Sequence, residues 1–422
     1  MRILISGTTY HPALNGQAIF TVNLAEGLAR RGHQVLMLGQ SEKCQPYQVE
    51  RNGVWFEAAR TISVDKAYPG MHATVFPGQP VAQVVKKFRP DIIHIQDHFP
   101  LTQFVYKMAR RLKIKVVGTN HFMPGNVTPY LPGANRLRPF YDWVLWRWML
   151  SLYNHLDVVT APSRTAAAIL HAQKIKPPVY PVSCGVDLGR FHPMPGLDVS
   201  DWRRRYNLDP LRVVFLFVGR VDGEKRIDVL LRALRLLDRE DIQLAVAGRG
   251  AVLSDLQSLT ARLGLGDRVR FLGFVPDADL PSLLNSVDAF AMPSEAELLS
   301  IATLEAMASS RPVMAAKSQA LPELVSEGSN GYLFQPGDPS DAARYIATLA
   351  DHPERLPAMG AASLEKVRPH SLENTLSRYE EIYEAALAVA PARRPHLTPA
   401  YRPAGQKRAS KTVTEDQANP LN

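Results

Sequence analysis

The sequence predicts an α/β protein of two doubly wound parallel-sheet domains, because short apolar runs alternate with amphipathic helical patterns along most of the chain. The alternation breaks at the Pro- and Gly-rich stretch 191–196 and then starts again. A chain of 422 residues is also long enough for two or three domains. We therefore expect an N-terminal domain over residues 1–190 and a C-terminal domain over residues 191–370.

In the first half, short runs rich in Ile, Val and Leu predict buried strands, and the amphipathic patterns between them predict helices. Strands that are separated by helices at this spacing run parallel, because a parallel connection needs a crossover of a dozen or more residues. The expected strands are residues 2–6, 34–38, 91–96 and 115–118, and the expected helices are residues 19–31, 81–88 and 101–112.

The second half repeats this pattern and adds two segments after it. A helix over residues 371–390 is expected to pack back on the N-terminal domain. Residues 391–422 are rich in Pro, Ala, Arg, Lys and Thr, which predicts a basic tail without packed structure. The expected strands are residues 213–218, 242–247, 269–272, 289–292 and 312–315, and the first expected helix is residues 227–237.

Composition bears on the cellular compartment. The sequence has no apolar run of 18 residues, so we expect no membrane span. It begins directly with an expected strand and lacks the features of a signal peptide. Its two cysteines, Cys44 and Cys184, are too few for a disulfide framework or a zinc site. These features together predict a cytoplasmic protein.

The charge is distributed unevenly along the chain. Residues 1–190 hold 22 Lys and Arg against 10 Asp and Glu, whereas residues 191–390 hold 21 against 28. A basic half favours an anionic partner, such as a membrane surface or a nucleic acid, although a solvated basic face gives the same count. The basic half has no recognisable nucleic-acid-binding motif, so we expect no nucleic-acid partner.

The most informative stretch holds two acids, Glu297 and Glu305, eight positions apart. This separation predicts a loop carboxylate, then a helix N-terminus between the two acids, then a helix carboxylate. A helix N-terminus binds anions through its free N–H groups, so two acids beside it suit a ligand that is part sugar and part phosphate. An exposed loop acid followed by a first-turn helix acid is the plain structural alternative.

Further polar residues follow the expected strands, at the edge where doubly wound sheets bind ligands. Arg220 and Lys225 come after strand 213–218 and are suited to bind a diphosphate in the place of a metal ion. Gly16 precedes the first helix, where a glycine lets a phosphate approach backbone amides. A plain loop glycine is the alternative at that position.

Two histidines end strands of the first half, and an acidic pair follows a strand of the second. We expect His98 and His121 to be more exposed than core histidines and able to donate to a sugar hydroxyl, with a structural role as the alternative.

Asp277 and Asp279 have the D-x-D spacing of a metal motif. They follow a proline and open a helical stretch, so helix capping is the better interpretation.

These residues resemble those of a known family, the family 4 glycosyltransferases. The most specific match is the stretch from Glu297 to Glu305, continued by residues 306–313. Supporting matches are residues 219–225, 327–334 and 182–191, and the resemblance covers nearly the whole chain, from residue 1 to about residue 388. It implies retaining enzymes with the GT-B fold, in which two Rossmann-like domains face one another across a cleft.

The resemblance implies a nucleotide-sugar donor held mainly by the C-terminal domain. Arg220 and Lys225 would bind the diphosphate, Glu305 would bind the ribose hydroxyls, and Glu297 would lie near the donor sugar.

Other matched positions would complete the implied donor site. The backbone amides of Ser300 and Ile301 would reach sugar or phosphate, and Val275 would lie beside the base. Gly16 would lie near the diphosphate, and His121 near the transferred sugar.

The implied mechanism is front-face transfer with retained anomeric configuration, in which the leaving phosphate oxygen accepts the proton of the acceptor. It needs no cofactor and no metal, because the cationic clamp stabilises the nucleoside diphosphate, and the two domains close over the donor. One departure concerns the donor-sugar contact. Leu298, Leu299 and Ser300 stand where the family usually has a small or polar residue and then Phe-Gly, which implies a weak or altered donor preference.

The acceptor is expected to be a lipid. Residues 119–132 are similar to the same region in bacterial members that glycosylate diacylglycerol-type lipids. The helical pattern at 140–155 is apolar apart from a narrow polar stripe. It predicts either a core helix or an interfacial surface for acyl chains. The stripe consists of Arg147, Ser151, Asn154 and His155.

We therefore expect transfer of a hexose from a UDP- or GDP-sugar to diacylglycerol or a glycolipid, by an enzyme that docks its basic domain on anionic lipid at the inner face of the cell membrane. A soluble acceptor, such as a sugar phosphate or a glycan, is the alternative. A dinucleotide-dependent protein is a remote one, because residues 7–18 lack the glycine fingerprint after the first strand.

Overall fold

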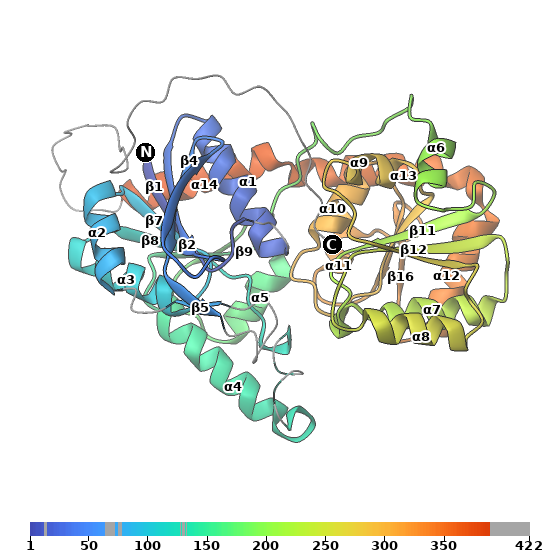
Figure 1. Ribbon diagram of the computed structural model, residues 1–422, viewed down its shortest axis with the longest axis horizontal. Helices are drawn as coiled ribbons and strands as arrows, with labels where there is room; N and C mark the ends of the chain where they lie inside the picture. Colours follow the sequence, from blue (N-terminus) through green and yellow to red (C-terminus); the bar gives the residue numbers. More distant parts are fainter. Residues whose placement is uncertain are drawn as a thin grey trace.

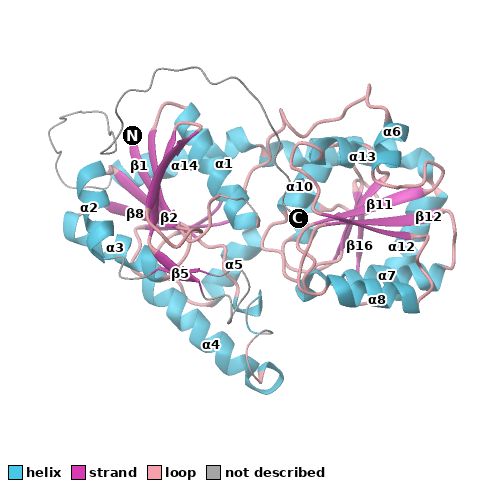
Figure 2. Ribbon diagram, viewed as in Figure 1, coloured by secondary structure: helices cyan, strands magenta, loops and turns pink. Residues whose placement is uncertain are grey.

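The computed structural model describes residues 1–11, 15–63, 72–74, 78–126, 128, 131 and 133–388. These residues form two α/β halves, each built around its own sheet (Figures 1 and 2). The predicted tail over residues 391–422 and part of the predicted acceptor stretch, at residues 127, 129, 130 and 132, lie outside the described residues.

The N-terminal sheet has eight strands in the order β10-β9-β8-β7-β1-β2-β4-β3, and β3 is antiparallel to β4. The four strands predicted in this half are confirmed, because buried apolar runs mark them. A small antiparallel ribbon of β5 (Thr61–Ser63) and β6 (His72–Thr74) lies apart from this sheet. The sheet consists of β1 (Arg2–Ser6), β2 (Gln34–Gln40), β3 (Tyr47–Arg51), β4 (Val54–Ala59), β7 (Ile92–Ile95), β8 (Lys115–Thr119), β9 (Val158–Ala161) and β10 (Val179–Pro181).

Helices cover both faces of this sheet, because apolar side chains of β1 point alternately to one face and to the other. Ile3 and Ile5 belong to the same apolar cluster as Phe20 of α1, whereas Leu4 belongs to the cluster of the opposite face. That second cluster takes in α2, α3, α5 and the C-terminal end of α4. The helices are α1 (Gly16–Arg30), α2 (Gly78–Phe88), α3 (Pro100–Leu112), α4 (Ala134–Tyr153) and α5 (Arg164–Ala172), with a short 3-10 turn, η1 (Pro124–Asn126).

The C-terminal sheet has six parallel strands in the order β13-β12-β11-β14-β15-β16. The predicted strands of this half lie within one residue of the observed bounds, and only β16 was not predicted. The strands are β11 (Val213–Val218), β12 (Ile242–Ala247), β13 (Val269–Gly273), β14 (Ala289–Met292), β15 (Val313–Ala316) and β16 (Gly331–Phe334). The helices are α6 (Val199–Arg205), α7 (Ile227–Leu237), α8 (Leu253–Arg262), α9 (Leu280–Asn285), α10 (Ile301–Ala308), α11 (Leu321–Leu324), α12 (Pro339–Asp351) and α13 (Leu356–Val367).

A last helix, α14 (Leu372–Ala388), follows the C-terminal domain and packs against α1 of the N-terminal domain (Figure 1). Two of its tyrosines reach the sheet. The Tyr383 hydroxyl lies 2.7 Å from His94 Nδ1, and the Tyr379 hydroxyl lies 3.1 Å from Thr119 Oγ1. All four side chains are buried, so each polar atom of this junction finds its partner inside the protein.

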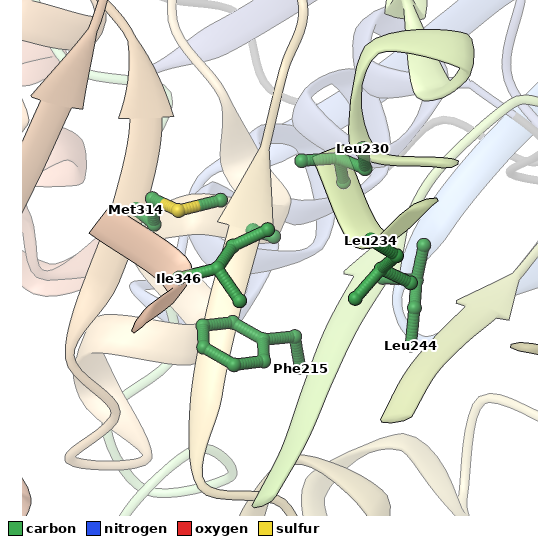
Figure 3. Close-up of a pocket in the computed structure, with 7 residues that line it drawn as sticks. Phe215, Leu230, Leu234, Leu244, Met314 and Ile346 are labelled. Carbon is green, nitrogen blue, oxygen red and sulfur yellow. The ribbon is translucent and has the colours of Figure 1, made fainter. Parts of the chain in front are cut away.

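A small void lies in the core of the C-terminal domain, between the sheet and helices α7 and α12 (Figure 3). Only apolar side chains line it, and no polar group is there to orient a ligand. It is a gap in core packing, which leaves the strand-end loops as the place to look for a site.

Candidate active site

Two predicted site residues form an ion pair at the carboxyl edge of the C-terminal sheet. Lys225 belongs to the 3-10 turn η3 (Gly223–Lys225) after β11, and Glu297 lies in the loop after the neighbouring strand β14. Lys225 Nζ lies 2.5 Å from Glu297 Oε1, and both side chains are largely buried. The parallel order of β11 and β14 brings their following loops together, so the pairing follows from the topology.

Arg220 lies in the same loop as Lys225 and is also held by carboxylates. Its guanidinium pairs with Asp222 and lies 2.9 Å from Glu224 Oε1. Asp222 in turn accepts a hydrogen bond from the backbone N–H of Ala251 at 2.9 Å, which ties this loop to the one after β12. Both cations of the predicted clamp are thus fixed by acids that an entering diphosphate would compete with.

The glycines of the β12 loop serve close backbone packing. A Cβ added to Gly248 would lie 1.8 Å from the carbonyl oxygen of Gly219, and one added to Gly250 would lie 2.3 Å from that of Val221. No side chain fits at either position. The loops that follow β11 and β12 therefore lie backbone against backbone.

The helix start predicted between the two glutamates is confirmed, because α10 begins at Ile301. Ser300 is its N-cap, and its hydroxyl accepts a hydrogen bond from the Thr303 N–H at 3.2 Å. Glu305 lies inside the helix and is only 8% exposed. Burial raises the pKa of its carboxyl group to about 8, opposed by the nearby positive charge of Arg190 and reinforced by Asp277.

Gly16 begins α1 and faces this helix start from the N-terminal domain. Asn15 caps α1 by accepting a hydrogen bond from the Ala18 N–H at 2.9 Å. A Cβ added to Gly16 would lie 3.9 Å from Ile301 Cδ1, so the two predicted residues approach each other across the domain junction. The N-termini of α1 and α10 therefore lie close together, and both offer backbone N–H groups.

His121 follows β8 and is hydrogen-bonded to the end of the neighbouring strand. Its Nε2 lies 3.0 Å from Gln96 Oε1, and its ring packs on Phe20 with centroids 4.9 Å apart. An amide oxygen only accepts, so Nε2 carries the hydrogen. Burial lowers the pKa of His121 to about 3, so its imidazole is neutral at physiological pH.

The expectation that His98 is exposed was wrong. Its side chain is fully buried, with its ring stacked on Phe99 and edge-on to Phe122 and Trp148. Neither ring nitrogen has a hydrogen-bond partner, and burial lowers its pKa to about 4. The reason is α4, whose Trp148 covers this strand end.

Val275 lies two residues beyond β13, partly buried against the core. The neighbouring Asp277 lies 2.7 Å from Arg190 and acts on the pKa of Glu305, so this loop borders the Glu305 side of the site. The capping interpretation of Asp277 and Asp279 is confirmed for the position of Asp279 but not for a capping hydrogen bond. Asp279 stands at the N-cap of α9 without a capping hydrogen bond, and it binds the Tyr206 hydroxyl at 2.9 Å instead.

Sequence reasoning missed several residues of this region. Gln96, which contacts His121, carries no motif, and Arg190, which lies near Glu305, stands in the matched stretch 182–191 but was assigned no role. The order of strands β7 and β8 would have placed Gln96 beside His121, but that order is known only from the fold. Within the described part of the chain, no group of three or more His, Cys, Asp or Glu side chains is arranged to hold a metal ion.

Sequence models of two glycosyltransferase families match the chain, one in each half. The model described as Glycosyltransferase Family 4 matches residues 14–190, and the model described as Glycosyl transferases group 1 matches residues 198–366. Together they account for the residues that build both sheets except β1.

Two curated proteins illustrate what the chain is similar to. It is 27% identical to alpha-monoglucosyldiacylglycerol synthase of Streptococcus pneumoniae over 401 residues, which is 92% of this chain and 86% of that protein. It is 33% identical to D-inositol 3-phosphate glycosyltransferase of Streptomyces scabiei over 214 residues, which is 48% of each chain.

Solved structures share the fold over nearly the whole chain. Sucrose-phosphate synthase from Thermosynechococcus elongatus has a TM-score of 0.78 at 21% identity, covering 92% of this chain and all of that one. Anabaena HepE in complex with UDP-glucose has a TM-score of 0.73 at 19% identity, covering 91% and 100%. The predicted fold class, two Rossmann-like doubly wound domains in the GT-B arrangement, is confirmed.

Proposed function

Because the chain belongs to the glycosyltransferases, with a family 4 domain followed by a group 1 domain, we propose that it transfers a hexose to a membrane lipid. The donor is a UDP- or GDP-hexose, and the acceptor is a hydroxyl group of diacylglycerol or of a glycolipid. Transfer retains the anomeric configuration. The enzyme works as a peripheral protein at the inner face of the cell membrane.

The ion pair of Lys225 and Glu297 beside the start of α10 is the observation that carries the donor assignment. Lys225 and Arg220 bind the diphosphate and stabilise the charge that develops as it leaves, which makes a metal ion unnecessary. Glu297 is then free to accept hydrogen bonds from hydroxyls of the donor sugar, and Glu305 binds the ribose. A UDP-glucose complex of Anabaena HepE supports a nucleotide-sugar donor.

The N-terminal domain supplies the other side of the donor site. Gly16 leaves room for the diphosphate at the N-terminus of α1, and Ser300 and Ile301 offer their amides opposite. His121 lies near the transferred sugar, and its neutral state keeps a positive charge away from the positive charge that the sugar develops. The acceptor proton passes to the leaving phosphate oxygen, so no protein base is needed.

Helix α4 supports a lipid acceptor. Its C-terminal end is buried at Met149, Leu152 and Tyr153, while its N-terminal end projects away from the domain (Figures 1 and 2). On the projecting part, four apolar side chains are between 38% and 57% exposed. An exposed apolar face on a basic helix fits the surface of an anionic bilayer. The four residues are Leu137, Phe140, Trp143 and Val144.

The basic residues of α4 complete this surface. Arg136 and Arg147 are exposed beside the apolar face, and the Arg147 guanidinium lies 5.3 Å from the centroid of the Trp143 ring. Within the described residues, no helix has the length and apolar character needed to cross a bilayer. The exposed apolar and basic side chains of α4 lead us to place this helix on the membrane surface.

Liposome flotation tests the membrane part. The protein should float more with phosphatidylglycerol vesicles than with phosphatidylcholine vesicles. Exchanging Phe140 and Trp143 for Ser should reduce binding to both, and Arg136→Gln with Arg147→Gln should remove only the excess on anionic vesicles. Leu236→Ser, which removes a 60% exposed side chain of α7, is the matched control. Equal binding of the wild type to both vesicles would rule out the electrostatic part.

Product analysis tests the reaction. UDP-glucose, UDP-galactose and GDP-mannose are offered with diacylglycerol or phosphatidylinositol vesicles, and in parallel with soluble sugar phosphates and glycans. A glycolipid of retained configuration supports the proposal, whereas product from the soluble acceptors alone replaces it by the alternative. Glu297→Ala should abolish transfer, while Glu295→Ala, two residues earlier and paired with Arg226, should not. Full activity of Glu297→Ala would refute its assignment.

A further inference from the structure

We infer that the N-terminus of α5 is a latch between the two domains, and that Ser163 and Glu323 are positioning residues that hold the Glu297 loop ready for transfer. Ser163 and α5 belong to the N-terminal domain, whereas Glu323 lies in α11 and Glu297 after β14, both in the C-terminal domain. The inference rests on the proposed function, since it concerns the loop that contacts the donor sugar there.

Ser163 makes two hydrogen bonds, one within its own domain and one across the junction. As the N-cap of α5, its hydroxyl oxygen accepts from the Ala166 N–H at 3.0 Å. The same hydroxyl donates to the backbone carbonyl oxygen of Leu298 at 2.6 Å. Leu298 directly follows Glu297, so the fixed carbonyl restrains the backbone that carries the donor-sugar acid.

Glu323 supplies the second part of the latch. Its two carboxylate oxygens accept from the backbone N–H groups of Thr165 at 2.7 Å and Arg164 at 3.2 Å. These are among the first N–H groups of a helix, which have no partner inside the helix itself and lie at its positive end. A side chain of one domain thus fills hydrogen-bonding positions of the other (Figure 1, α5 and α11 at the junction).

Leu298 adds an apolar contact to these polar ones. Its side chain is 9% exposed and belongs to the apolar cluster of the N-terminal domain, together with Ala166 and Leu170 of α5. The residue that departs from the usual small or polar one in the resembled family therefore anchors the Glu297 loop in the opposite domain. A second restraint comes from within the C-terminal domain, where the Ala320 N–H donates to the Glu297 carbonyl at 3.1 Å.

The contacts of Ser163 with Leu298 and of Glu323 with α5 exist only while the domains are together, because each joins an atom of one domain to an atom of the other. In contrast, most residues proposed to bind the nucleotide lie in the C-terminal domain, namely Arg220, Lys225 and Glu305, and only Gly16 of the N-terminal domain borders the diphosphate. Loss of the latch should therefore slow transfer while leaving nucleotide affinity unchanged. A purely structural role for α5 would instead lower stability and weaken both.

The test separates helix capping from the contact across the junction. Ser163→Asp keeps a good N-cap but has no hydroxyl to donate to Leu298, whereas Ser163→Thr keeps both functions. We expect Ser163→Asp and Glu323→Gln to lower kcat about tenfold, with the Kd of UDP and the thermal midpoint close to wild type, and Ser163→Thr to restore activity. The control is Glu327→Gln, because Glu327 lies four residues after Glu323 and its side chain is exposed.

A measurement that needs no activity keeps this inference separate from the proposed function. Small-angle scattering with UDP bound should give a larger radius of gyration for Ser163→Asp than for wild type and Ser163→Thr. Unchanged kcat and unchanged dimensions in Ser163→Asp and Glu323→Gln would overturn the latch. Absence of transfer by the wild type on any acceptor would refute the proposed function, whereas the scattering result would still decide on the latch.

Discussion

At the scale of single residues, Glu305 is a buried carboxylic acid that is proposed to bind the ribose. Its carboxyl group is 8% exposed, and its pKa of about 8 lies above the ordinary 4.5. The folded protein therefore keeps the proton over a pH range in which the unfolded chain has lost it. The stability that this proton contributes is fully present below about pH 4.5 and is lost progressively as the pH rises to 8.

Glu305→Gln should remove this dependence, because an amide does not titrate. We expect the thermal midpoint of the variant to rise relative to wild type between pH 5 and pH 8, and nucleotide binding to weaken because one ribose contact changes. Differential scanning calorimetry at pH 5, 6.5 and 8 measures the first effect. A difference between the two proteins that stays constant with pH would contradict the assignment.

Gln96 determines which nitrogen of His121 carries hydrogen, at a contact of 3.0 Å. Gln96→Glu would place a carboxylate there and favour the imidazolium form of His121, which burial and the nearby His94 oppose. The variant should lose activity as the pH falls and His121 becomes protonated, while wild type stays level. Gln96→Met should lower activity equally at all pH values, and the pH profiles of kcat distinguish the two outcomes.

The sequence predicts some of these contacts and leaves others hidden, for a physical reason. Lys225 and Glu297 each follow a strand, so a parallel sheet with β11 beside β14 brings them together. His98 also follows a strand, yet it is buried, because Trp148 of a helix fifty residues away covers it. Glu323 contacts α5 only because two domains meet, and no local pattern encodes that meeting.

At the scale of elements, the sequence predicts most of the buried strands, but it misses the buried strands β4 and β9 as well as strands at the edges. The predicted bounds of β11, β12 and β14 match the structure at both ends. Strand β3 has exposed residues on an edge, and β10 has three residues, so neither carries a clear apolar signal. Helix α4 was predicted to be either a core helix or an interfacial surface. Only its C-terminal end is buried at the sheet, so the core interpretation holds for that end alone.

The structure at the start of α10 explains why Ser300 can stand where the resembled family usually has the glycine of Phe-Gly. Ser300 has a φ of −89°, which needs no glycine, and its hydroxyl caps the helix. Ser300→Ala should therefore destabilise the protein by about 1 kcal/mol, and Ser300→Gly by only a few tenths. Thermal unfolding of both variants measures this order. If Ala and Gly proved equally harmless, the hydroxyl would not be acting as a cap.

At the scale of the whole molecule, the connections between the domains include the chain itself, the contacts at α5, and helix α14. Helix α14 leaves the C-terminal domain and buries Tyr379 and Tyr383 against the N-terminal sheet, and Arg31 of that domain pairs with Glu380 at 2.6 Å. The α5 contacts lie at the strand-end side, whereas α14 lies across α1 (Figure 1). One connection is thus close to the donor site and the other packs on a helix of the core.

The packing of α14 on α1 depends on Gly27, and a double-mutant cycle can show it. A Cβ added to Gly27 would lie 2.6 Å from Cδ1 of Leu376, a side chain that is 1% exposed. In wild type, Gly27→Ala should therefore lower the thermal midpoint, although alanine favours a helix over glycine by about 1 kcal/mol. In a Leu376→Ala background the obstacle is gone, and the same substitution should raise the midpoint. An equal effect in both backgrounds would mean that the two helices are not coupled at this contact.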